Sequence, residues 1–176
     1  MTRARQLKIR GKPVAVDEVP GLYAVNRGAG PVERVDDPLA LPALDVESVV
    51  ASAPGMRRAA IETLQRAGWR FVRSPEQPRV DGPVARLFVF AGGRPALSTN
   101  RLIVGFRTAV ADAEAARILA RHGGRVIEKL SFASGLYHIA VDPPPGEDVL
   151  DAAAALDAED EVEFAEPEFI ETLSGR

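Results

Sequence analysis

The sequence predicts an α+β protein whose C-terminal half is a ferredoxin-like βαββαβ antiparallel sheet. Two observations predict it: strand-like and helix-like segments follow one another there in that order, and all of them fit within about seventy residues. Because each crossover helix has to cover the apolar face of the strands that it joins, both helices are expected on one face of the sheet. The other face is then left open, and we expect a partner to cover it.

The first strand and first helix of this half have the clearest patterns. NRLIVGFR, residues 100–107, alternates as a strand. Its two faces are Leu102, Val104 and Phe106, and Ile103, Gly105 and Arg107. ADAEAARILARHGG follows with apolar residues at helical spacing, and two glycines stand where a helix ends.

The remaining elements complete the order. RVIEKL and GLYHIAVD alternate as a hairpin joined by SFAS, and three prolines from Pro143 then end the second strand. Glu147 and Asp148 lie where a helix N-terminus favours negative charge, and the second helix follows them. VEFAEPEF, residues 162–169, closes the series as the last strand. Val162 and Phe164 are expected to face inward, and Pro167 to end the strand.

The N-terminal half predicts a smaller, degenerate α+β subdomain. GLYAVNR and VARLFVFAG are expected strands, and GMRRAAIETLQRAGWRFV is an expected helix that runs into a strand. Helix, glycine and strand follow one another around Gly68 as they do around Gly123, which is a faint internal repeat. We expect an irregular insertion from Gly28 to Pro42. The predicted organisation is residues 1–95, residues 96–170 and an exposed tail of residues 171–176.

Composition excludes several classes of function. The 22 basic and 25 acidic residues are well mixed and give a net charge of −3, so nucleic acid is not an expected partner. The chain has no cysteine, which excludes disulfides and thiolate chemistry. No apolar run reaches the roughly 20 residues of a membrane span, and no secretory signal is recognisable, so the chain is expected to be cytoplasmic as it stands. It would be secreted if it is part of a longer precursor.

Catalytic motifs are not found in the sequence. His122 is expected to lie at a helix end, and no orienting partner for His138 lies near it in the sequence. Neither histidine has metal-ligand spacing around it, AGGR lacks the lysine of a phosphate-binding loop, and no serine lies in a nucleophile elbow. We therefore expect a protein that is not an enzyme and that needs no cofactor and no metal.

Four segments together resemble a known family. NRLIVGFR, ILARHGGRVIEKL, GLYHIAVD and VEFAEPEF occur in the order and spacing of the propeptide of subtilisin-like serine proteases, including its fervidolysin-like N-terminal prodomain form. The resemblance covers about Thr99 to Ile170, and PALST before the first strand resembles the shape found in longer members. The protease's own catalytic segments are absent from the sequence.

The resemblance implies an inhibitor and folding assistant of a subtilisin-like protease, acting in cis as part of a precursor or in trans. Glu166 and Glu168 match the positions that cap two helices of the protease, and Glu168 departs from the usual Asn or Asp. The open face is expected to contact the protease through Ile103, Arg107, Leu136, His138, Ala140 and Ala165. The tail is expected to lie in the substrate cleft through Phe169, Ile170, Glu171, Thr172, Leu173 and Ser174.

Two other functions stay open at this point. The same predicted fold is compatible with a ferredoxin-like regulatory module that binds a small ligand or dimerises through its open face. An enzyme that uses His138 is the third possibility. Three glutamates crowd into the last strand, and Glu163 has no role in any of these interpretations.

Overall fold

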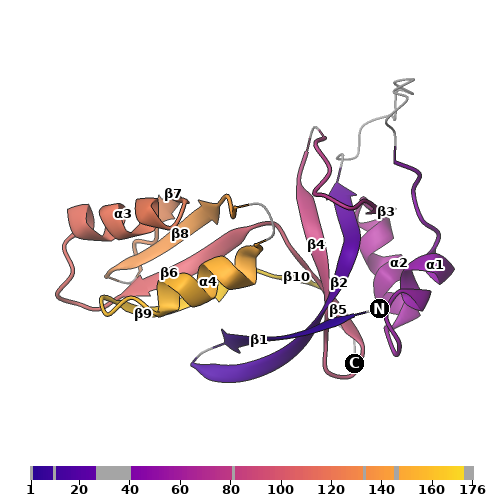
Figure 1. The fold of residues 1–176 in the computed structure, drawn as a ribbon, viewed down its shortest axis with the longest axis horizontal. Helices are drawn as coiled ribbons and strands as arrows, with labels where there is room; N and C mark the ends of the chain where they lie inside the picture. Colours follow the sequence, from indigo (N-terminus) through magenta and orange to yellow (C-terminus); the bar gives the residue numbers. More distant parts are fainter. Residues whose placement is uncertain are drawn as a thin grey trace. The chain divides into compact units, whose positions relative to one another are not determined.

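A computed structural model describes residues 2–9, 11–26, 41–80, 82–132, 134–144 and 147–172. The chain divides into two compact units. The first consists of Met1–Arg5, Ala15–Thr99 and Phe169–Arg176, and the second of Gln6–Val14 and Asn100–Glu168. The described residues form α-helices and antiparallel sheets, so the predicted α+β class is confirmed (Figure 1).

The first sheet has the strand order β1-β2-β4-β5-β10, and β3 pairs with β2. Its strands are β1 (Arg3–Ile9), β2 (Lys12–Asn26), β3 (Trp69–Arg73), β4 (Val84–Phe90), β5 (Arg94–Ser98) and β10 (Ile170–Glu171). The register between β2 and β4 shifts between Glu18 and Tyr23, which is typical of a β-bulge. This long second strand is drawn in indigo in Figure 1.

Helices α1 (Val46–Ala51) and α2 (Arg58–Arg66) pack against each other in the first unit. The carboxylate of Asp45 caps α1 by accepting a hydrogen bond from the Ser48 amide at 2.7 Å. The buried side chains of the two helices join the first sheet in one apolar core. Its members include Val49, Ile61, Leu64, Leu22, Phe71, Leu87 and Leu97.

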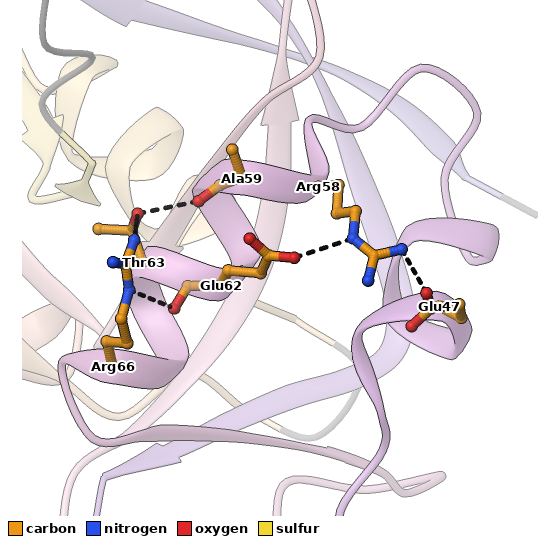
Figure 2. Close-up of polar contacts among 6 residues, drawn as sticks. All are labelled: Glu47, Arg58, Ala59, Glu62, Thr63 and Arg66. Atoms are coloured by element: carbon orange, nitrogen blue, oxygen red, sulfur yellow. Dashed lines mark hydrogen bonds and ion pairs between the residues drawn. The ribbon is translucent and has the colours of Figure 1, made fainter.

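An exposed polar network links α1 to α2. The Arg58 guanidinium donates a hydrogen bond from Nε to Glu62 at 2.8 Å and also bonds Glu47 of α1, as Figure 2 shows. All three side chains are largely in water, and surface ion pairs of this kind contribute about 0–1 kcal/mol. The apolar contacts of Val49, Ile61 and Leu64 therefore hold the helices together, and the network adds little.

The main part of the second unit, residues 100–168, has the element order β-α-β-β-α-β. Its elements are β6 (Arg101–Phe106), α3 (Asp112–Arg121), β7 (Gly124–Lys129), β8 (Leu136–Val141), α4 (Val149–Asp157) and β9 (Val162–Pro167). The strands form an antiparallel sheet in the order β7-β8-β6-β9. His122 is the C-cap of α3, before Gly123 with φ +68°, and Asp148 with Asp151 forms a capping box at the start of α4.

Burial alternates along β8 and the first part of β6 in the second sheet. Leu102 and Val104 of β6 and Ile139 of β8 have no exposed surface, whereas Ile103 and His138 are half-buried. The hydroxyl of Tyr137 donates a hydrogen bond to Asp112 of α3 at 2.8 Å, so α3 lies on the buried face. The opposite face of the sheet carries half-buried side chains, among them Ile103 and His138.

The N-terminal half differs most from expectation. The structure contains β1, the first part of β2, α1 and β5 in addition to the expected elements, and the first sheet has more strands than the second. The repeat is limited to helix, glycine and strand: Gly68 after α2 and Gly123 after α3 both have positive φ, at +91° and +68°. The strand orders of the two sheets are different, so the first unit is not a smaller copy of the second. Most of the expected insertion, residues 28–40, lies outside the described residues.

Candidate functional site

Three side chains from three strands lie next to one another on the half-buried face. Ile103 of β6 pairs with His138 of β8 on one side and with Glu166 of β9 on the other. Paired residues of antiparallel strands point to the same face of the sheet. The register therefore brings together Ile103 and His138, which the sequence predicts for this face, and Glu166, which the resemblance predicts as a helix-capping residue.

We use the name open face for a defined set of half-buried side chains. They are Ile103, Leu136, His138, Ala140, Phe164 and Glu166. Leu136 pairs with Gly105, and Ala140 pairs with Arg101 and Arg125 of the neighbouring strands. This set combines four apolar side chains with one imidazole and one carboxylate, and His138 also pairs with Glu128 of β7.

Glu168 follows the last strand and reaches back to the open face. Its amide donates a hydrogen bond to the Arg101 carbonyl oxygen at 2.9 Å, which holds the backbone beyond Pro167 in place. One carboxylate oxygen of Glu168 lies 3.0 Å from Nε2 of His138, and the two side chains are 41% and 16% exposed. Glu168 is therefore the partner of His138 that the sequence does not reveal, because the two residues are 30 positions apart.

A β-bulge separates Val162 from Phe164 and corrects one prediction. The pairs Phe106–Val162 and Gly105–Phe164 leave Glu163 as an extra residue on β9. Val162 is buried on the helix side, but the bulge turns Phe164 to the open face, where its ring lies over Gly105. The prediction that Phe164 faces inward with Val162 is therefore wrong. Glu163 is exposed and is the bulged residue, which explains its presence.

Ala165 and Arg107 lie elsewhere than expected. Ala165 pairs with Val104 and is 4% exposed, so it belongs to the helix-covered face. The same bulge causes this difference, because one added residue reverses the faces of the positions that follow it. Arg107 lies beyond the end of β6 and is exposed, and its Nε donates a hydrogen bond to the Asp160 carbonyl oxygen at 2.6 Å. It fixes the loop before β9.

The start of the expected tail is part of the first unit. Phe169 contacts Phe88 and Phe90 edge-to-face, with ring centroids 5.7 and 5.2 Å apart. Ile170 and Glu171 form β10, which pairs with β5. Thr172 is half-buried, and Leu173 and Ser174 lie outside the described residues. The sequence has no signal for the pairing of β10, because a two-residue strand shows no alternation.

Tyr137 and Glu159 have shifted pKa values, and both residues lie away from the open face. Burial and the hydrogen bond to Asp112 raise the pKa of Tyr137 to about 12. His122 lies 2.6 Å from Glu159, and this hydrogen bond lowers the pKa of the Glu159 carboxyl. Both contacts join helices to the rest of the second unit, so we interpret them as structural.

The described residues contain neither a candidate metal site nor a candidate membrane-spanning helix. Within them, no group of three or more His, Asp or Glu side chains has the placement of a metal site. None of the helices in this part of the chain has the length and apolar character needed to cross a bilayer.

The fold is α+β, and the open face presents hydrogen-bonding groups within an apolar sheet surface. Residues 90–168 match the family model of the fervidolysin N-terminal prodomain. The resemblance predicted from the sequence is thereby confirmed over these residues, and the match is consistent with a subtilisin-like propeptide. It extends from the end of β4 to Glu168 and includes β6–β9 with both intervening helices. Neither the curated proteins nor the solved structures gave a significant match.

Proposed function

We propose that this chain is a non-catalytic inhibitor and folding assistant of a subtilisin-like serine protease, acting in cis or in trans. One observation carries the proposal: Ile103, His138, Glu166 and Glu168 gather on one face of the unit that matches a protease prodomain. The strand order β7-β8-β6-β9 supports a ferredoxin-like architecture for this unit, with both helices on the opposite face.

The apolar part of the open face would contact two surface helices of the protease. Half-buried Ile103, Leu136 and Phe164 offer the area that such helices bury, and area of this kind provides most of the favourable free energy of association. Ala140 is small enough to allow close approach of a helix backbone. Contact with a partner would remove this apolar surface from water.

Glu166 and Glu168 would accept hydrogen bonds from free amides at the N-termini of those helices. A helix N-terminus attracts a carboxylate by about 0.3–1 kcal/mol, and by up to about 2 kcal/mol where the site is partly buried. Glu168 is 41% exposed beside His138, and its second carboxylate oxygen has no part in that contact. The C-terminal tail would then lie in the substrate cleft as an added strand, held there by main-chain hydrogen bonds.

Inhibition of a panel of purified subtilisin-like proteases tests the proposal. We expect slow, tight inhibition of at least one member. The double substitution Glu166→Ala, Glu168→Ala should weaken it by about tenfold or more, because two caps of about 1 kcal/mol each are lost. Glu163→Ala is the matched control, since it removes an exposed glutamate of the same strand and should leave inhibition unchanged.

Three results would contradict the proposal. Inhibition of no protease in the panel is the most direct. A marked fall in the melting temperature of the double variant, together with its loss of inhibition, would show that the two glutamates stabilise the fold. A concentration-dependent dimer through the open face, without protease binding, would favour a dimerising or ligand-binding module instead.

A further inference from the structure

The tail begins with an aromatic contact that the proposed function does not use. The ring of Phe169 lies edge-on to the rings of Phe88 and Phe90 in β4, at interplanar angles of 83° and 81°. Edge-to-face contacts are a favoured geometry for aromatic side chains. Both partners are buried residues of the first unit. Phe169 therefore has a specific place on this unit's sheet.

The next two residues continue the same attachment. Ile170 pairs with Leu97 and Glu171 with Ala96, in antiparallel register along β5. The carboxylate of Glu171 also lies 3.6 Å from the Arg94 guanidinium. Aromatic, main-chain and ionic contacts thus act together on three consecutive residues, immediately after Glu168 in the second unit.

We propose that the first unit is an anchor for the tail, and that the segment entering the protease cleft begins at Thr172 rather than at Phe169. This inference rests on the proposed function and assigns a role to the N-terminal half. The ring of Phe169 cannot fill a pocket of the protease while it contacts Phe88 and Phe90. Phe169 is thus a positioning residue, and the residues after Glu171 are the ones that bind in the cleft.

Anchoring has a physical advantage for inhibition. A free tail loses backbone freedom at every residue when it becomes extended in a cleft. A tail in which Phe169 already contacts β4 and the next two residues are extended on β5 loses less, and pre-organisation of this kind improves affinity without adding contacts to the partner. The first unit then contributes to inhibition without touching the protease.

A reversible cross-link tests this inference. The chain has no cysteine, so Ala96→Cys with Glu171→Cys introduces one unambiguous pair at directly opposed positions of β5 and β10. Opposed residues of antiparallel strands have Cα atoms about 4.5–5.5 Å apart, within the range that a disulfide spans. We expect the bond to form under mild oxidation. The pair Arg94→Cys with Ile170→Cys is the matched control, since its side chains lie on opposite faces of the sheet and should not cross-link.

The oxidised chain should inhibit the protease that the unmodified chain inhibits best, within about twofold of its reduced form, because β10 stays on β5 in the complex. Loss of inhibition on oxidation, restored by reduction, would overturn the anchoring and show that the tail has to leave β5. Failure of the bond to form would also overturn it. If neither form inhibits any protease, the proposed function fails, and the cleft start at Thr172 fails with it.

Two further measurements do not depend on the cross-linked complex. Phe169→Ala in the two-cysteine background should slow disulfide formation in the free chain, and an unchanged rate would overturn the role of Phe169 as the anchor. If Ala96→Cys prevents folding, hydrogen exchange of residues 169–171 in the unmodified chain gives the answer. Protection that persists in the protease complex supports the anchor, and protection that disappears there overturns it.

Discussion

The imidazole of His138 and the carboxylate of Glu168 lie 3.0 Å apart and join the two strands that flank β6. His138 belongs to β8, and Glu168 follows β9, so the contact passes over the central strand beside Ile103. It connects His138, which has no orienting partner nearby in the sequence, to Glu168, one of the two proposed capping carboxylates. The pair therefore orients Glu168 within the open face before any partner binds.

Replacing His138 tests how much that orientation matters. The contact is partly in water, so His138→Gln should lower the free energy of unfolding by less than about 1 kcal/mol, measured by urea denaturation. His138→Ala should weaken protease inhibition less than Glu168→Ala does, because the carboxylate itself forms the cap. If His138→Ala and His138→Gln both weakened inhibition as much as Glu168→Ala does, the imidazole would contact the protease directly.

Gly105 is required by the ring of Phe164. A Cβ atom at position 105 would lie 2.4 Å from Cε1 and 2.8 Å from Cζ of that ring, so Gly105→Ala has to displace it. We expect a loss of about 1–3 kcal/mol in the free energy of unfolding, and weaker inhibition because the open face changes shape. In a Phe164→Ala background the same substitution should cost much less. Additive costs in the double variant would exclude this contact as the cause.

The elements that sequence patterns predict are those with strong periodicity and clear ends. β6, α3, β8 and α4 have alternating or helical apolar patterns, and their ends carry glycine, proline or a capping Asp148. β5 was missed because its first two residues, Arg94 and Pro95, follow two glycines and look like a linker. Those glycines form the turn between β4 and β5, both with positive φ, at +77° and +73°.

The candidate site was predicted in composition but not fully in geometry. Alternation places Ile103, Leu136, His138 and Ala140 on one face, and the register agrees. It fails in β9, because the bulge at Glu163 exchanges the faces of Phe164 and Ala165 relative to expectation. A bulge depends on the partner strand as well as on its own residues, so a single strand's pattern does not reveal it. The His138–Glu168 and Phe88–Phe169 contacts are likewise products of tertiary structure.

Two adjacent glycines provide a matched comparison in the first unit. Gly92 and Gly93 both have positive φ, which costs about 1–2 kcal/mol for an alanine. A Cβ on Gly92 would meet only the end of the Arg57 side chain at 3.5 Å, whereas one on Gly93 would lie 1.8 Å from the Gly55 carbonyl oxygen. Urea denaturation should therefore show a loss of about 1–2 kcal/mol for Gly92→Ala and more than about 3 kcal/mol for Gly93→Ala. Similar losses would mean that the turn moves away from Gly55.

Glu159 makes the stability of the second unit depend on pH. The hydrogen bond from His122, with help from Arg121, lowers the pKa of the Glu159 carboxyl below its usual 4.5. A carboxyl with a lowered pKa in the folded state stabilises the fold above about pH 4.5 and loses that contribution as the pH falls through the folded value. Glu159→Gln should consequently flatten the decline in melting temperature between pH 5 and pH 3, roughly the range in which a carboxyl of this kind titrates. Glu163→Gln, which removes an exposed carboxylate of the β9 bulge, should keep the decline of the unmodified chain; an equal flattening in both variants would assign the effect to net charge instead of the His122 contact.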